Sequence, residues 1–292
     1  MNKNFLGIAL GGGGVRGAAH VGVLQELDRA GIKIDTISGV SAGAVIGAMY
    51  AYSLDAKWIE KKFRQIWSSH IMKNNLQKYL INPNSNQSFF NRINTSFNNL
   101  TLAFMGLFRN YIFDSKYLIK ILDELIPESS FENMKIPLKV IATNISTGED
   151  IVYDSGDVKD AIIKSCAIPG VFKPINNGNN LLVDGGVGMP VPVEPLLGIC
   201  QFIIAVDIGC YQFQKLKNPN IADLKTRASI ITSNRLKKIL SSHADYIIRP
   251  DTRGFHWSRF EKAETLFDSG KLAVIENLGI LREKIDNNIT LT

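Results

Sequence analysis

A serine lies at the centre of a Gly-x-Ser-x-Gly pattern at residues 39–43. The stretch before it, 32–37, predicts a strand, and residues 42–52 are small, apolar and free of proline, which predicts a buried helix. A tight turn from strand to helix leaves room only for hydrogen two residues before and after the serine, so Gly39 and Gly43 fit such a turn. Ser41 would then lie at the start of a helix, where amides and the helix dipole stabilise negative charge. The pattern predicts a nucleophile or, alternatively, a serine that only caps the helix.

A second glycine-rich segment, Gly-Gly-Gly-Val-Arg-Gly at 12–17, follows a predicted strand at 5–10 and precedes a predicted helix at 18–30. It also fits the Gly-x-Gly-x-x-Gly pattern of dinucleotide sites, which requires a carboxylate at the tip of the second strand. Asp35 is near the required distance, but we expect it inside that strand, because the serine turn occupies the tip. A nucleotide site therefore lacks its second element.

The same glycine loop can direct backbone amides at the oxyanion that forms when an ester is cleaved. Glycines suit this role because no side chain obstructs the approach of the backbone. Arg16, at the start of the following helix, could fix the loop or attract an anionic head group. A third reading assigns the loop only to close packing of the helix on the sheet.

A nucleophilic serine needs a base, and Asp184 is the best candidate. It ends a short apolar strand predicted at 181–183, and Gly185 and Gly186 leave space around its carboxylate. An aspartate can take the serine proton directly where the site contains little water. Asp-Gly-Gly is also an ordinary turn sequence. A histidine-dependent triad stays open, although none of the four histidines lies in a recognisable loop after a strand: His20, His70, His243 and His256.

The rest of the chain continues to alternate strands and helices, which indicates an α/β fold with a parallel sheet. With no clear linker, we expect a single domain over 1–292, with a mainly helical part at about 215–292. Further strands are predicted at 138–144, 151–154, 202–206 and 246–249, and further helices at 55–69, 116–126, 157–166, 221–242 and 258–285.

Basic charge is concentrated in one part of the chain. Residues 61–113 contain seven lysines and arginines and no acidic residue. This suggests an anionic partner such as nucleic acid or an acidic lipid surface or, alternatively, only a solvated basic face. Apolar side chains recur at helical spacing between 97 and 111, as in core packing, an interfacial helix or a lid. We therefore expect a basic, aromatic-rich insertion or lid at about 70–113, with possible peripheral membrane contact.

Composition favours a cytoplasmic protein. No apolar run approaches the roughly 18 residues of a membrane span, and the N-terminal stretch has no signal peptidase site. Three cysteines without metal-ligand spacing, Cys166, Cys200 and Cys210, fit a reducing compartment.

Four motifs in order resemble the patatin-like phospholipases: the glycine loop at 12–17, Gly-Val-Ser-Ala-Gly at 39–43, Ser-Cys-Ala-Ile-Pro-Gly-Val-Phe-Lys-Pro at 165–174, and Val-Asp-Gly-Gly at 183–186. The resemblance covers about residues 5–210. It implies a three-layer α/β/α sandwich and a phospholipase or esterase that cleaves lipid acyl esters through an acyl-enzyme. It implies no metal or cofactor, and we expect no nucleic-acid partner.

By position, Ser41 resembles the family's nucleophile and Asp184 its base, which together form a Ser-Asp dyad. The oxyanion loop corresponds to Gly12, Gly13 and Gly14, and supporting positions are Arg16, Gly17, Gly39, Gly43, Gly185 and Gly186. The chain departs from the family at Met189-Pro190, where many relatives have an asparagine before the proline, so the hydrogen bonding of that loop is open. Functions of other classes are a nucleotide-binding protein and a non-catalytic lipid-binding module.

Overall fold

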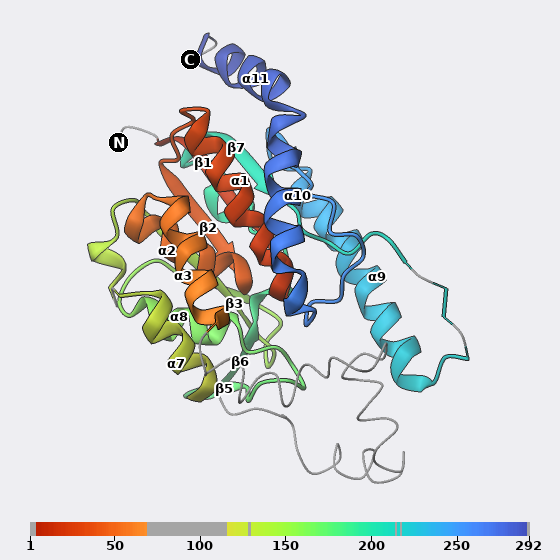
Figure 1. The fold of residues 1–292 in the computed structure, drawn as a ribbon. Helices are drawn as coiled ribbons and strands as arrows, with labels where there is room; N and C mark the ends of the chain where they lie inside the picture. Colours follow the sequence, from red (N-terminus) through yellow and green to blue (C-terminus); the bar gives the residue numbers. More distant parts are fainter. Residues whose placement is uncertain (1–3, 69–115, 128–129, 214, 217, 291–292) are drawn as a thin grey trace.

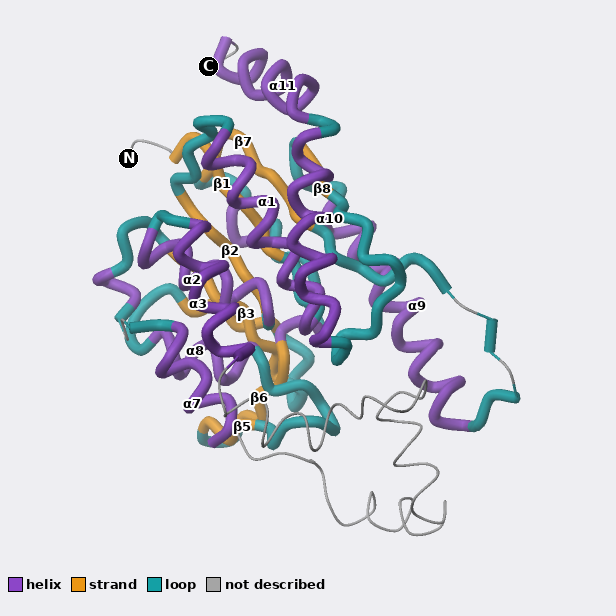
Figure 2. The backbone as a smooth tube through the Cα atoms, in the orientation of Figure 1, coloured by secondary structure: helices purple, strands orange, loops and turns teal. Residues whose placement is uncertain are grey.

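The computed structural model describes residues 4–68, 116–127, 130–213, 215–216 and 218–290. Within these ranges an eight-stranded sheet forms the centre of the molecule, with helices packed on it (Figures 1 and 2). The strands lie in the order β5-β6-β3-β2-β1-β7-β8, and β4 pairs with β3 beside this path. Their bounds are β1 Asn4–Leu10, β2 Thr36–Val40, β3 Leu138–Asn144, β4 Asp150–Tyr153, β5 Ile175–Asn177, β6 Asn180–Asp184, β7 Cys200–Val206 and β8 Tyr246–Ile248.

Parallel pairing joins β8, β7, β1, β2 and β3. By contrast, β4 and β6 run antiparallel to β3, and β5 runs antiparallel to β6. Parallel neighbours need crossover connections, and these are helical between β1 and β2 and between β7 and β8. The predicted α/β sandwich with a mainly parallel central sheet is confirmed, with an antiparallel part added at the β3 side.

The helices largely follow the predicted segments, and the stretch 258–285, predicted to be mostly helical, contains α10 and most of α11. Short 3-10 turns adjoin the two motifs that carry glycines: η1 Gly14–Gly17 and η4 Gly185–Val187. The α-helices are α1 Ala18–Arg29, α2 Ala42–Ser53, α3 Ala56–Ser68, α7 Lys116–Leu125, α8 Val158–Ser165, α9 Ile221–Ser241, α10 Ala263–Ile275 and α11 Leu278–Thr290.

The strand before Ser41 begins later than the sequence predicts. The pattern favours 32–37, whereas β2 begins at Thr36 and ends at Val40. The carboxylate of Asp35 accepts the Leu6 amide at 3.0 Å, and the Asp35 amide donates to the Leu6 carbonyl at 2.9 Å. Because a side chain replaces a backbone partner here, regular pairing starts only at the next residue. Asp35 therefore lies before the strand, at the end opposite the serine.

Strand β5 has no counterpart among the strands predicted from the sequence. Its three residues, Ile-Asn-Asn, are too few and too polar to give a strand pattern. β5 forms because Gly178, with φ of 63°, closes a tight hairpin that pairs Asn177 with Asn180.

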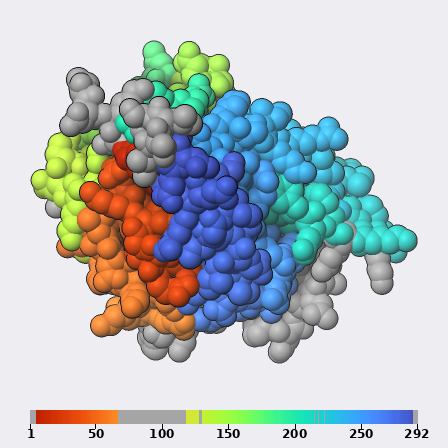
Figure 3. Space-filling view, turned by 90° about the horizontal axis from the view of Figure 1, so that it is seen from above, coloured from red at the N-terminus to blue at the C-terminus, as the bar shows by residue number. Residues whose placement is uncertain are grey.

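Helix α1 lies in close contact with α10 from the C-terminal part of the chain. A Cβ at Gly22 would lie 2.0 Å from the Phe267 carbonyl oxygen, and one at Gly270 would lie 2.0 Å from that of Ala19. Figure 3 shows the N-terminal and C-terminal segments side by side on this face. Residues of the C-terminal part thus support the helix that follows the glycine loop.

Among the described helices, none is both long and apolar enough to pass through a lipid bilayer. The predicted insertion or lid at about 70–113 falls outside the described residues.

Candidate active site

The pairing of three strands brings the serine turn and Asp184 together. Val40, the last residue of β2, pairs with Ile141 of β3, and Asp184, the last residue of β6, pairs with Ala142. β4 occupies the other edge of β3 at both positions. β6 therefore continues along the same edge of β3 at the point where β2 ends, and Ser41 emerges next to Asp184.

The backbone at Ser41 is strained. Its φ of 53° and ψ of −122° are unusual for a residue with a side chain. The turn is crowded on both sides: a Cβ at Gly39 would lie 2.5 Å from the Gly43 carbonyl oxygen, and one at Gly43 would lie 2.0 Å from that of Leu10. This is the close approach that the glycines of the pattern predict.

Ser165 secures the turn from another element. Its hydroxyl oxygen accepts the Ser41 backbone amide at 2.8 Å, and its side chain is fully buried at the end of α8. The bond satisfies an amide that would otherwise be buried without a partner. Sequence reasoning did not single out Ser165, although it is the first residue of the motif at 165–174.

Asp184 is buried, with 7% of its surface exposed. One carboxylate oxygen accepts the Gly186 amide at 2.7 Å, and a Cβ at Gly185 would lie 2.3 Å from the Ile141 carbonyl oxygen. Burial raises the pKa of Asp184 from 3.8 to about 6, against the stabilising effects of the Ser41 side chain, the Gly186 amide and the Lys237 charge. The carboxyl group therefore titrates close to neutral pH.

The glycine loop lies against the serine, since a Cβ at Gly12 would be 3.4 Å from that of Ser41. The Gly12 amide, however, donates to the Pro190 carbonyl at 3.0 Å. The sequence predicts Gly12 as an oxyanion donor, and in the structure its amide already has this partner. Within the described ranges, the amides of Gly13 and Gly14 donate no hydrogen bond.

Another available amide lies directly after the serine. Ala42 opens α2, where the first amides of a helix have no acceptor inside the helix. Within the part of the chain that the structure describes, its amide donates no hydrogen bond. The residue after a nucleophilic serine commonly supplies an oxyanion donor, so the sequence pattern could have identified Ala42.

The supporting positions predicted around the loop make close contacts. Arg16 donates through Nε to the Gly13 carbonyl at 3.2 Å, and burial lowers its pKa against the attraction of Cys210 and Asp207. A Cβ at Gly17 would lie 2.7 Å from the Ala42 Cβ, so η1 and α2 pack tightly. At Met189, where the sequence departs from the family resemblance, the backbone amide donates to the Gly185 carbonyl at 2.8 Å, which links this loop to the turn after Asp184.

No histidine in the described ranges hydrogen-bonds Ser41. The fully buried His20 donates through Nε2 to the Gly11 carbonyl at 2.7 Å, and burial lowers its pKa to about 4, so it is neutral. His243 is exposed, and His256 contacts Ser258 at 2.8 Å. His70 lies outside the described residues.

Lys237 of α9 is a further residue of the site that the sequence analysis did not identify. Its side chain is 4% exposed, and Nζ donates to the Gly12 carbonyl at 2.7 Å. A lysine within a basic helix has no distinctive sequence pattern, because the carbonyl that it meets is 225 residues away in the chain.

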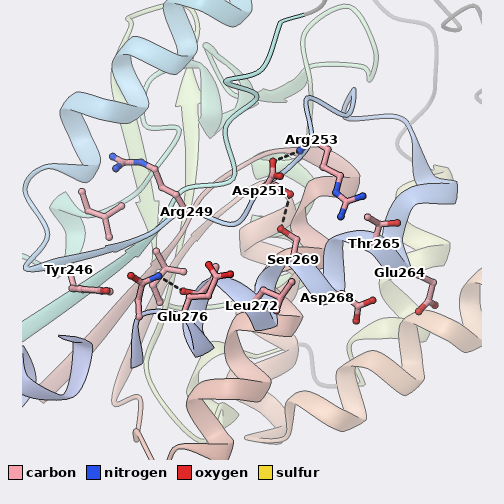
Figure 4. A pocket seen from close by; sticks show the side chains of 14 residues that line it. Tyr246, Arg249, Asp251, Arg253, Glu264, Thr265, Asp268, Ser269, Leu272 and Glu276 are labelled. Atoms are coloured by element: carbon pink, nitrogen blue, oxygen red, sulfur yellow. Dashed lines mark hydrogen bonds between the residues drawn. The ribbon is translucent and has the colours of Figure 1, made fainter. Parts of the chain in front are cut away.

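A cavity of about 790 Å³ lies elsewhere, between β8 and α10 (Figure 4). Charged side chains from α10 and from the segment after β8 line it, among them Asp268, Arg249 and Asp251. Neither Ser41 nor Asp184 belongs to its lining, so this cavity is separate from the serine turn.

A model of the family described as patatin-like phospholipase matches residues 8–197, which include Ser41 and Asp184. The chain belongs to the patatin-like phospholipase family. The family match ends before α9, so Lys237 lies outside it.

Curated relatives of this patatin-like chain are mostly much longer proteins. It is 25% identical over 299 residues to the neuropathy target esterase sws of Drosophila melanogaster, which covers 92% of this chain and 19% of that protein. It is 24% identical over 300 residues to patatin-like phospholipase domain-containing protein 6 of Homo sapiens, and the match covers 92% of this chain and 20% of that protein. An uncharacterized NTE family protein of Mycobacterium tuberculosis is 28% identical over 203 residues, and this match covers 69% of this chain and 48% of that protein. The chain thus spans a fifth to a half of these relatives.

Solved structures show a more distant similarity. VipD from Legionella pneumophila is 17% identical with a TM-score of 0.39, over 92% of this chain and 67% of that one. ExoU from the ExoU-SpcU complex of Pseudomonas aeruginosa is 17% identical with a TM-score of 0.42, over 97% and 52%.

Proposed function

We propose that this chain is a lipid acyl hydrolase, a phospholipase or esterase in which Ser41 is the nucleophile and Asp184 the base. The observation that carries the proposal is the placement of Ser41 and Asp184 at neighbouring positions along β3, with the Ser41 side chain close enough to lower the pKa of the carboxyl group. Family membership and the esterase and phospholipase names of the relatives support a lipid ester as the substrate.

In the first half of the proposed reaction, the Asp184 carboxylate takes the Ser41 proton while Oγ attacks the ester carbonyl carbon. The amides of Gly13, Gly14 and Ala42, which donate no hydrogen bond within the described residues, are the candidates to stabilise the resulting oxyanion. The protonated aspartate then gives its proton to the leaving alcohol. In the second half, Asp184 deprotonates a water molecule, which attacks the carbonyl carbon of the acyl-enzyme. The bond from that carbon to Ser41 Oγ then breaks, Asp184 returns the proton to Oγ, and the fatty acid is released.

The electrostatics of the site favour this assignment of roles. A base with a pKa of about 6 is ionised at neutral pH, yet basic enough to accept a proton as the reaction proceeds. The neighbouring Cys166 is not a competing nucleophile: burial and the Asp184 charge raise the pKa of its thiol far above neutral.

The alternatives have weaker support. A dinucleotide site would use a carboxylate at the tip of β2, but Asp35 lies at the other end and accepts the Leu6 amide. A histidine triad would need a histidine next to Ser41, whereas His20 and His256 bond to other groups and His243 is exposed. A non-catalytic lipid-binding module differs from an enzyme only in activity. A cytoplasmic location and membrane contact through about 70–113 stay predictions.

A direct test combines hydrolysis of a chromogenic acyl ester with fluorophosphonate labelling of purified protein. We expect hydrolysis and labelling at Ser41 in the wild type, loss of both in Ser41→Ala, and strong loss of hydrolysis in Asp184→Asn. Ser38→Ala is the matched control, because Ser38 is buried in β2, the strand that leads to Ser41, and its hydroxyl has no partner in the described residues. Full hydrolysis in both Ser41→Ala and Asp184→Asn would disprove the proposal. Liposome binding without hydrolysis or labelling would favour the lipid-binding module. Dinucleotide binding without labelling would favour the nucleotide-binding protein.

A further inference from the structure

Lys237 reaches the glycine loop from a helix that the family match does not include. Its ammonium group is almost completely buried, which is costly unless neighbouring groups compensate the charge. The Gly12 carbonyl oxygen provides one compensating contact, at 2.7 Å. The carboxylates of Asp184 and Asp207 attract the ammonium from the ends of β6 and β7. A buried lysine therefore contacts the glycine loop and is attracted by the proposed base.

The contact with Gly12 determines more than the position of one oxygen. The Gly12 carbonyl and the Gly13 N–H belong to one peptide unit, which is planar and trans, so the two groups point in opposite directions. A cation bound at the oxygen fixes the direction of the N–H and polarises the unit, which makes the N–H a stronger donor. The Gly13 amide donates no hydrogen bond within the described residues, so it is free to serve a ligand.

We propose that Lys237 is a positioning residue of the proposed hydrolase, one that orients and polarises the Gly12-Gly13 peptide for oxyanion binding. This inference rests on the proposed function. It assigns a catalytic contribution to a part of the chain outside the matched family region, and it explains why α9 buries a cation at this point.

Charged and titratable groups surround Lys237 on several sides. Arg16 and His20 lie on the elements that follow the glycine loop, and Asp184, Asp207 and Cys210 face it from the ends of two strands. Burial, together with the Arg16 charge, lowers the pKa of Lys237 to about 8, against the attraction of Asp207, Asp184 and Cys210. The ammonium form is thus present at neutral pH and is lost on mild alkalinisation.

The test compares Lys237→Met, which removes the charge, with Lys237→Arg, which keeps it at all accessible pH values. Lys225→Met is the matched control, because Lys225 is an exposed lysine of the same helix. The measurements are kcat and KM on a chromogenic acyl ester across the pH range, and the rate of fluorophosphonate labelling at Ser41. Thermal unfolding of each variant checks that the protein is folded.

We expect Lys237→Met to lose about ten-fold to a hundred-fold in kcat with little change in KM, since the contact acts on the transition state. The acid limb of its pH-activity profile should move to higher pH, because the pKa of Asp184 rises when a neighbouring positive charge is removed. The wild type should lose activity above a pH of about 8, Lys237→Met should lack this alkaline limb, and Lys237→Arg should retain activity there. Lys225→Met should match the wild type throughout.

Two results would overturn the inference while the proposed function stands, provided that the wild type is active. One is a Lys237→Met variant with the kcat of the wild type. The other is a Lys237→Met variant that loses stability and activity but keeps both the acid and the alkaline limb of the wild-type pH profile. If Lys237→Met does not fold, the wild-type alkaline limb and its absence in Lys237→Arg decide the question. A wild type that neither hydrolyses the ester nor is labelled at Ser41 would overturn the proposed function and this inference together.

Discussion

Ser41 and Asp184 lie next to neighbouring positions of β3. Val40, the residue before Ser41, pairs with Ile141, and Asp184 pairs with the next residue, Ala142. Two segments that lie 143 positions apart in the sequence therefore meet along one edge of a single buried strand. Register along a strand is fixed by the residues that it buries, so the separation of serine and carboxylate does not depend on a loop. Such a rigid arrangement is what a pair of groups needs to transfer a proton between them.

Activity should depend on pH through Asp184. The carboxylate must be ionised to accept the serine proton, and its pKa is raised to about 6. We expect kcat/KM to fall as the pH decreases through about 6, and the rate of fluorophosphonate labelling to fall in the same range. If kcat/KM stays constant down to a pH of about 4, the ordinary pKa of an aspartate, the result would contradict this role.

Asp184→Asn should stabilise the fold at neutral pH while it removes activity. Because the folded-state pKa is raised from 3.8 to about 6, the folded protein binds this proton more tightly than the unfolded chain does. The wild type should lose stability as the pH rises from about 4 through about 6, and the asparagine variant should not. The expected difference above this range is about 3 kcal/mol. Urea unfolding on both sides of the range measures it, with the exposed Asp268→Asn as a control that should show a far smaller change.

Ser165→Ala should weaken both the fold and the reaction. It leaves the buried Ser41 amide without its 2.8 Å partner, which costs about 1 to 3 kcal/mol. The strained turn at Ser41 would also lose a support, so labelling by a fluorophosphonate should become slower. Ser38→Ala removes a buried hydroxyl that has no partner in the described residues, and it should change stability little. Equal effects of the two substitutions in urea unfolding would argue against a specific role for Ser165.

Gly43→Ala should disrupt the serine turn. The new methyl group would lie 2.0 Å from the Leu10 carbonyl oxygen, so α2 or the buried β1 would have to move. We expect a loss of at least about 3 kcal/mol and of nearly all hydrolysis. Gly279→Ala is the comparison, because it places a methyl group in open space on α11 and should stabilise by up to about 1 kcal/mol. Thermal unfolding and the ester assay together check both expectations. A Gly43→Ala variant as stable and active as the wild type would show that the turn can adjust.

The sequence by itself determined the local elements and the chemical candidates. Hydrophobic periodicity places β3 at the observed residues, and the glycines around Ser41 and Asp184 identify two turns that have the right chemistry. These features are visible because each depends on residues within a few positions of one another. The start of β2 is wrong in the sequence analysis, because the Asp35 side chain replaces a backbone partner that belongs to another strand.

Only the tertiary structure decided which of these groups meet and which are already engaged. The order of β2 and β6 along one edge of β3 brings Asp184 to Ser41, and the Pro190 carbonyl accepts the Gly12 amide. Helix α9 brings Lys237 to the Gly12 carbonyl, which belongs to the next peptide unit. Contacts of this kind join residues far apart in the chain and depend on strand register and helix packing. No periodicity or local motif in a single sequence records them, because a hydrogen bond to a backbone carbonyl places no requirement on the side chain of the residue that accepts it.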